Sequence, residues 1–370
     1  MDSNVDLADR FDISGPTHIM SRRSGVHHSS AMVIDWNNEE DRRCIAACVV
    51  KGTYILEKDR TMCRMQTAEA LAPAWWESFH FRLLDVFSEE SFTREYDKLI
   101  FGAIYEHVPP PAGGRRHPCA PQYIVAFRGT MLPHPKVIHD VVLDLQILAN
   151  TLEYSRRSHR AHKAVDKLLG TIDSSAVWLA GHSLGASLAL EVGRTMMAER
   201  GINLSTFLFN PPHVSPAPAI NKILPCEGLR GEIFAKSARV KARVGQVLSQ
   251  GPHRERMEEL FERLSPWAPN LYVHDRDVIC QGFVDYFEQR QQLEERCRSA
   301  TTLSYRDMLF STIGKEKERP HLLPSATLWK NSSMDRDAHG IQKLLAAHEL
   351  QQWWKPDGEL RMIATRYSFA

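Results

Sequence analysis

The chain has 370 residues, of which 43% are hydrophobic and 25% are charged, and its formal net charge is +1. These values are ordinary for a soluble globular protein and exclude the highly charged, weakly hydrophobic composition of a disordered chain. A nucleic-acid-binding protein is expected to carry a basic excess or a basic stripe, and the balanced charge gives no support for such a partner.

The chain has seven cysteines, an odd number, and no two of them are spaced as Cys-x-x-Cys. This pattern favours free thiols in a reducing compartment over a disulfide framework or a zinc site. The N-terminus lacks the basic and apolar regions of a secretory signal, and no apolar run approaches the roughly 20 residues that span a bilayer. We therefore expect a soluble cytoplasmic protein.

The first quarter of the chain changes character near Asp41. Residues 1–35 are polar with scattered Gly, Pro and Ser, which predicts loops. From Asp41 to Leu56, apolar residues recur at helical spacing and predict a buried helix. The segment 72–87 is rich in Trp and Phe. We interpret it as a helix packed on the core rather than as a lipid-facing surface, since large aromatics dominate cores.

The middle of the chain alternates short apolar runs with helical segments. The runs end abruptly at polar residues or glycine and predict strands at 122–127, 176–180, 204–209 and 271–274. Helical periodicity predicts helices over 156–169 and 186–200, each closed by a glycine. Strands that alternate with helices predict an α/β fold, with a mostly parallel sheet and helices on both faces.

A long stretch, residues 213–268, separates the third and fourth of these strands. Connections of this kind are usually about 2–6 residues long, so we predict a helical insertion in a single domain that spans residues 1–370. Its centre has an apolar stripe next to basic residues, and such a helix either packs on the core or lies on an anionic membrane surface. The stripe consists of Phe234, Val240, Val244, Val247 and Leu248, and the basic residues are Lys236, Arg239, Lys241 and Arg243.

The pentapeptide Gly181-His-Ser-Leu-Gly185 has the pattern of a nucleophile turn between a strand and a helix. A serine hydroxyl becomes a good nucleophile only when a base removes its proton. The glycines are needed because side chains there would collide with the neighbouring strand and helix. The alternative is that Ser183 merely caps a helix, but the apolar strand before it and the strong helix after it favour a nucleophile.

Two backbone segments are candidates for an oxyanion hole. The N–H group of Leu184 lies at the start of the helix, where the helix dipole favours negative charge. A second donor is expected in the loop after an earlier strand, where Gly129 allows close approach and Thr130 offers an N–H group and a hydroxyl. An ordinary turn with a capping threonine is the alternative for this loop.

An acid and a histidine base are expected to follow the nucleophile along the chain. Asp275 and Asp277, after the fourth predicted strand, both qualify by position. Candidates for the base are His321, His339 and His348. His182 is excluded as the base because its side chain points away from the neighbouring serine.

Several further segments resemble the class 3 lipases, and within them a plant branch labelled GDSL esterase/lipase, although no Gly-Asp-Ser-Leu sequence occurs. The resemblance covers most of the chain. Its motifs include Phe11–Pro16, Asp41–Arg43, Gly52–Arg60, Ala72–Trp76, Phe127–Thr130, Phe209–Pro212 and Ala347–Asp357.

The resemblance implies an α/β-hydrolase fold, Ser183 as the nucleophile, Asp277 as the acid, and Thr130 with Leu184 at the oxyanion hole. It favours His348 as the base because of the spacing to Trp353-Trp354, with His339 as a competitor. It also implies carboxylic esters, including acyl lipids, as substrates, with no metal or cofactor. Two alternatives remain open: a catalytically silent lipase-like signalling protein, and an acyltransferase with the same triad.

Overall fold

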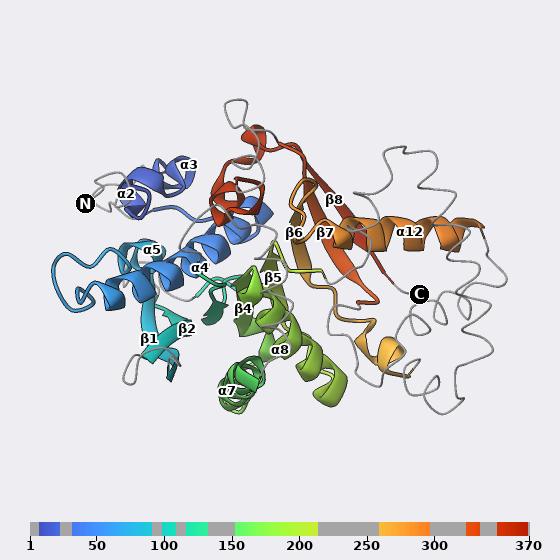
Figure 1. The fold of residues 1–370 in the computed structure, drawn as a ribbon, viewed down its shortest axis with the longest axis horizontal. Coiled ribbons are helices and arrows are strands. Elements are labelled where there is room, and N and C mark those ends of the chain that lie inside the picture. Colours follow the sequence, from blue (N-terminus) through green and yellow to red (C-terminus); the bar gives the residue numbers. More distant parts are fainter. Residues whose placement is uncertain are drawn as a thin grey trace.

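The computed structural model describes residues 7–22, 32–90, 98–108, 116–131, 152–213, 259–296, 323–333 and 346–368. Within these residues, eight strands form one sheet whose strand order follows the chain (Figure 1). The strands are β1 (Phe81–Glu90), β2 (Lys98–His107), β3 (Tyr123–Phe127), β4 (Val177–His182), β5 (Ser205–Phe209), β6 (Asn270–His274), β7 (Ala326–Asn331) and β8 (Met362–Tyr367).

The centre of the sheet is parallel and its edges are antiparallel. Strands β3 to β7 pair in parallel, whereas β1 and β2 on one side and β8 on the other pair antiparallel. The protein is therefore an α/β protein with a mostly parallel sheet. The carboxyl ends of β3 to β7 meet along one edge, where ligands usually bind in such sheets.

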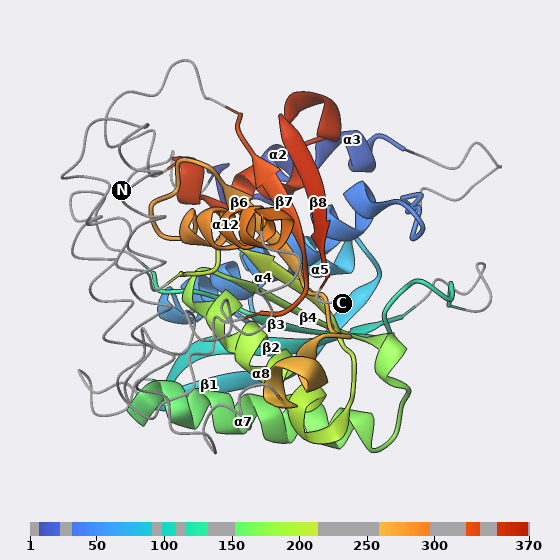
Figure 2. The same cartoon turned by 90° about the vertical axis from the view of Figure 1, so that its right-hand side faces the viewer.

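Helices cover both faces of the sheet (Figure 2). One face packs against α7 (Leu152–Leu169), α8 (Leu184–Arg200) and α12 (Gly282–Arg296), because right-handed crossovers that advance in one direction leave their helices on one side. The other face packs against the remaining helical elements. These are α2 (Phe11–Ser14), α3 (Thr17–Met20), α4 (Glu39–Thr61), α5 (Ala74–Glu77) and η3 (Leu350–Trp354).

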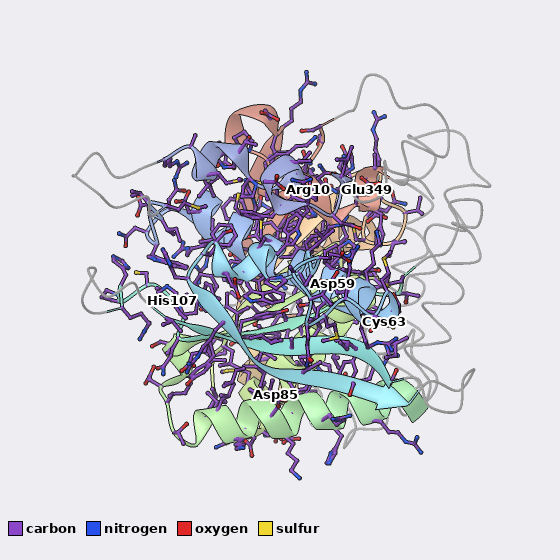
Figure 3. The ribbon with its side chains drawn as sticks, turned by 90° about the vertical axis from the view of Figure 1, so that its left-hand side faces the viewer. Arg10, Asp59, Cys63, Asp85, His107 and Glu349 are labelled. Carbon is purple, nitrogen blue, oxygen red and sulfur yellow. The ribbon has the colours of Figure 1, made fainter. Side chains whose placement is uncertain are left out.

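Two short 3₁₀ turns precede strands, η2 (Ser174–Ala176) before β4 and η4 (Asp357–Glu359) before β8. Side chains fill the space between the ribbon elements, with Asp85 marking β1, His107 the end of β2 and Asp59 the last turns of α4 (Figure 3). Among the helices in these ranges, none is long and apolar enough to cross a membrane.

The four predicted central strands are confirmed as β3, β4, β5 and β6, and the predicted helices as α4, α7 and α8. α8 ends as expected at Gly201, whose φ of 65° gives the left-handed conformation that glycine favours at a helix C-terminus.

Two predictions for the N-terminal part are wrong in detail. The segment 72–87 holds only the short helix α5, and from Phe81 onward it is strand β1. Its Trp and Phe side chains are nevertheless buried in the core, as expected. The 1–35 segment, predicted to be loops, contains α2 and α3; residues 1–6 and 23–31 lie outside the described residues.

Most of the predicted insertion also lies outside the described residues. The structure describes 213 and 259–268 of it, with a helix at 259–264, but not residues 214–258, which hold the apolar and basic stripe. At its described end, Trp267 packs against α8 so closely that a Cβ atom on Gly193 would lie 2.4 Å from the indole. The lipid-surface interpretation of the stripe stays a prediction.

Candidate active site

The chain makes a sharp turn at Ser183, at the carboxyl end of a central strand. β4 ends at His182, α8 begins at Leu184, and Ser183 between them has φ 54° and ψ −127°. A positive φ is uncommon for a residue with a side chain and costs on the order of 1–3 kcal/mol. Backbone strain of this kind concentrates at functional sites.

Close packing requires both glycines of this turn. A Cβ atom on Gly181 would lie 2.3 Å from the carbonyl oxygen of Gly185, and one on Gly185 would lie 2.3 Å from the carbonyl oxygen of Phe127. Both distances are far inside van der Waals contact, and both contacts are to backbone, which cannot move aside. The collision expected from the sequence is confirmed.

Ser183 is hydrogen-bonded in series with His348 and Asp277. Its Oγ atom is 3.0 Å from Nε2 of His348, and Nδ1 of the same imidazole is 2.7 Å from Oδ2 of Asp277. An ionised carboxylate can only accept hydrogen bonds, so Nδ1 carries the imidazole proton. Nε2 therefore presents its lone pair to the serine hydroxyl.

The carboxylate of Asp277 is buried and surrounded by donors. Oδ2 accepts from Nδ1 of His348, from Nδ2 of Asn210 at 2.7 Å and from the Cys280 thiol at 3.0 Å, while Oδ1 accepts from the backbone N–H of Ile279 at 3.0 Å. Burial alone would raise the pKa of Asp277, but its charge interaction with His348 and these hydrogen bonds outweigh burial and lower it. The group is therefore ionised at neutral pH.

Of the other residues considered for the acid and the base, the structure describes Asp275 and His182. Asp275 has 37% of its side chain exposed, and its carboxylate is 3.4 Å from Nδ1 of His274. His321 and His339 lie outside the described residues. The imidazole of His182 bonds away from the serine, to the hydroxyl of Tyr54 and to the backbone of the C-terminal segment.

The loop after β3 lies against the serine turn. A Cβ atom on Gly129 would lie 2.9 Å from Cβ of Ser183, so a side chain at this position would clash. The buried guanidinium of Arg128 donates to the carbonyl oxygen of Gly129 at 2.6 Å. This peptide bond is trans, so the N–H of Thr130 points away from that guanidinium. Leu184 is the first residue of α8, where backbone N–H groups have no partner within the helix.

Asn210 joins Asp277 to the segment that carries His348. It follows β5 with φ 47°, donates from Nδ2 to Asp277 and to the carbonyl oxygen of Ala347 at 3.0 Å, and accepts at Oδ1 from the indole N–H of Trp353 at 2.5 Å. The side chain is fully buried. Its three bonds set the position of His348 relative to Asp277.

Arg43, in the second turn of α4, also holds this C-terminal segment. Its buried guanidinium donates to the carbonyl oxygens of Trp353 at 2.9 Å and Lys355 at 2.8 Å, and to the carboxylate of Asp357 at 2.6 Å. Glu349, directly after His348, marks this segment in Figure 3. A segment with little regular structure is thus fixed by side chains of the sheet and of α4.

The sequence did not point to Tyr54, Asn210 or Arg43 as parts of the site. Asn210 had a usable signal, because it directly follows a predicted parallel strand and so belongs to the same sheet edge as Ser183 and Asp277. Tyr54 and Arg43 lie inside a long helix. Both fall in motifs of the family resemblance, but no local pattern marks their part in the site.

The chain is 34% identical over 371 residues to a GDSL esterase/lipase of Arabidopsis thaliana, an alignment that covers 97% of this chain and 98% of the relative. The chain belongs to the family of this GDSL esterase/lipase. In this member of the family the serine stands in Gly-His-Ser-Leu-Gly.

Two other comparisons add little. No protein-family model matches the chain. A lipase from Rhizopus microsporus var. chinensis is similar in structure over 64% of this chain and 69% of its own, with 16% identity and a TM-score of 0.30. A similarity this low carries no argument.

The described residues of this family member contain no group of three or more His, Cys, Asp or Glu side chains that could hold a metal ion. In the same part of the chain Cys44, Cys48, Cys63, Cys119 and Cys280 are free thiols. Cys280, beside Asp277, is buried; burial and the neighbouring carboxylate raise its thiol pKa, so it remains a hydrogen-bond donor.

Replacing Asn210 with aspartate is expected to destabilise the fold by about 3 kcal/mol at pH 8, because a second buried carboxylate would face Asp277 in place of a donor. Repulsion would raise the pKa of the new carboxyl above its unfolded value. Its destabilising effect is therefore smaller at low pH and grows as pH rises through that pKa. Urea unfolding at pH 5 and pH 8 measures the difference.

Asn331→Asp is the matched control for this prediction. Asn331 is also buried, at the last position of β7, but its Nδ2 donates to the amide oxygen of Gln352 rather than to a carboxylate. Its loss of stability should depend less on pH. Equal pH dependence in the two variants would show that Asn210 is not coupled to the charge of Asp277.

Proposed function

We propose that this protein is a serine carboxylic-ester hydrolase of the α/β-hydrolase fold, related to the class 3 lipases. The observation that carries the proposal is the series Asp277–His348–Ser183, with contacts of 2.7 and 3.0 Å, at the carboxyl edge of a parallel sheet. The strained turn at Ser183 and the esterase/lipase name of the Arabidopsis relative support it.

In the proposed reaction, His348 takes the proton of Ser183 through Nε2 while the serine Oγ attacks the ester carbonyl carbon. Asp277 holds the imidazole in the tautomer with the proton on Nδ1 and stabilises the cation that forms. Expulsion of the alcohol, protonated by His348, leaves an acyl-enzyme. Water activated by His348 then hydrolyses it and regenerates the serine.

The negative charge that develops on the carbonyl oxygen needs donors fixed in advance. We assign this role to the backbone N–H of Leu184, at the positive end of α8, and to Thr130, in the loop next to Ser183. The contact of Arg128 with the Gly129 carbonyl supports this assignment, because it fixes the orientation of the peptide group that supplies the Thr130 N–H. Loss of one such donor typically costs about 10²–10³ in rate.

The substrates we propose are carboxylic esters, with acyl lipids as the natural class. The name of the Arabidopsis protein, esterase/lipase, supports this choice. Comparison of a short p-nitrophenyl ester with an emulsified triacylglycerol separates an esterase from an enzyme that prefers aggregated lipid.

Labelling with a fluorophosphonate probe tests the proposal directly. We expect one probe per chain, attached to the peptide that contains Ser183 and located by mass spectrometry. The probe reacts only with an activated serine, so a catalytically silent lipase-like protein would remain unlabelled. Absence of labelling together with absence of ester hydrolysis would overturn the proposed function.

A further inference from the structure

His182 lies in a hydrogen-bonded chain that the proposed reaction does not use. Nδ1 is 2.9 Å from the hydroxyl of Tyr54, and Nε2 is 2.8 Å from the backbone carbonyl oxygen of His348. The Tyr54 hydroxyl in turn is 2.7 Å from the backbone nitrogen of Gly129. The chain therefore runs from the loop of the candidate oxyanion hole to the backbone of the candidate base.

The protons in this chain have only one consistent arrangement. The N–H of Gly129 donates to Tyr54, and burial raises the pKa of Tyr54 to about 12, so its hydroxyl keeps its own proton. The carbonyl of His348 can only accept, so Nε2 of His182 carries a proton. Nδ1 of His182 is then left to accept from Tyr54. Each donor in the chain has an acceptor, and His182 is in a single neutral tautomer.

The environment also keeps this ring uncharged. Burial, followed by the charge interaction with His348, lowers the pKa of His182 to about 3. The ring centres of His182 and His348 are 5.1 Å apart. Because His348 becomes positively charged during the proposed reaction, a second cation at this distance would oppose the step. A neutral His182 can donate to the backbone of His348 without that repulsion.

We propose that His182 is a positioning residue, which holds the backbone of His348 and, through Tyr54, the Gly129 loop in one hydrogen-bonded unit. This inference rests on the proposed hydrolase function. Gly129 fits between Tyr54 and the serine turn with no room to spare, since a Cβ atom there would lie 2.6 Å from the Tyr54 hydroxyl. Both the base and the loop are thereby held at fixed positions relative to Ser183.

Two substitutions of His182 separate its donor from its acceptor. Glutamine places an amide N–H near the position of Nε2 and can keep the bond to His348, whereas asparagine reaches only the position of Nδ1. We expect His182→Asn to lower kcat about 10²-fold with KM nearly unchanged, the size of loss that follows a displacement of about 1 Å at a catalytic group. His182→Gln should recover most of that loss. Wild-type kcat in His182→Asn would overturn the proposal.

Tyr54→Phe tests the other half of the chain with a smaller change. It removes one hydroxyl. We expect kcat to fall about tenfold, which corresponds to the net free energy of one hydrogen bond. Tyr105→Phe is the control, because Tyr105 is a buried tyrosine whose hydroxyl also bonds within the protein, to Thr53 of α4, but away from the serine. Equal kcat in the two variants, at equal loss of stability, would show a purely structural role and overturn the proposal.

The ¹⁵N resonances of the His182 ring provide a readout that does not depend on activity. In protein with ¹⁵N-labelled histidine, His182→Gln identifies the His182 signals by their absence. We expect a neutral ring with the proton on Nε2 from pH 5 to pH 8. A ring that titrates in this range, or a proton on Nδ1, would overturn the inference. If Ser183→Ala instead kept full ester hydrolysis, the proposed function would fail, and the ring signals would still decide the hydrogen-bonded link.

Discussion

Replacing Ser183 with alanine is expected to lower kcat for ester hydrolysis by about 10⁶-fold and to abolish fluorophosphonate labelling. Removing the nucleophile of a triad that acts as a unit typically has an effect of this size. The fold should persist, since the change removes one hydroxyl and leaves the strained backbone in place. Hydrolysis of p-nitrophenyl esters measures the rate, and a thermal unfolding curve checks the fold.

Ser187→Ala is the control for this variant. Ser187 lies one turn further along α8, and its backbone N–H bonds to the carbonyl oxygen of Ser183, a contact that alanine keeps. It should therefore hydrolyse esters at close to the wild-type rate. Full activity in Ser183→Ala would exclude this serine as the nucleophile and remove the basis of the proposed reaction.

Replacing His348 with alanine is expected to reduce kcat by a similar factor, about 10⁶. Ser183 then has no base to remove its proton, and Asp277 has no imidazole N–H to accept from. The structure gives a reason for choosing this residue, since its two ring nitrogens contact Asp277 and Ser183 at 2.7 and 3.0 Å. The same ester assay at pH 8 measures the effect.

His339→Ala provides the comparison, since His339 competes with His348 in the sequence pattern and lies outside the described residues. We expect only a mild effect. Reversed phenotypes, with a severe loss in His339→Ala and a mild loss in His348→Ala, would move the base to His339 and leave the nucleophile assignment intact.

The central part of the fold could be predicted from the sequence because buried parallel strands are short continuous apolar runs. Val177–His182 is buried along its whole length, and the apolar run 176–180 predicts its two ends to within two residues. The edge strands of the sheet have weaker sequence patterns. β8 has only partly buried and exposed residues and an apolar run of just three, Met362–Ala364. β1 begins inside an aromatic segment that suits a helix equally well.

The residues of the candidate site also differ in whether the sequence predicts them. Ser183 stands out because the turn needs glycines at fixed positions, and Asp277 because it follows a strand at the same sheet edge. The supporting contacts join residues far apart in sequence, such as Tyr54 with His182 and Asn210 with Trp353. No local pattern encodes such pairs, so only the folded structure reveals them.

The contacts between α4 and the C-terminal segment also affect when the candidate site can be completed during synthesis of the chain. Arg43 meets Trp353 across 310 positions of the sequence, and the indole N–H of Trp354 donates to the carbonyl of Ser14 across 340. Contacts between residues so far apart form late, and a growing chain folds from its N-terminal end. Ser183 is therefore synthesised 165 residues before His348. A chain that stops short of His348 would carry the proposed nucleophile without its proposed base.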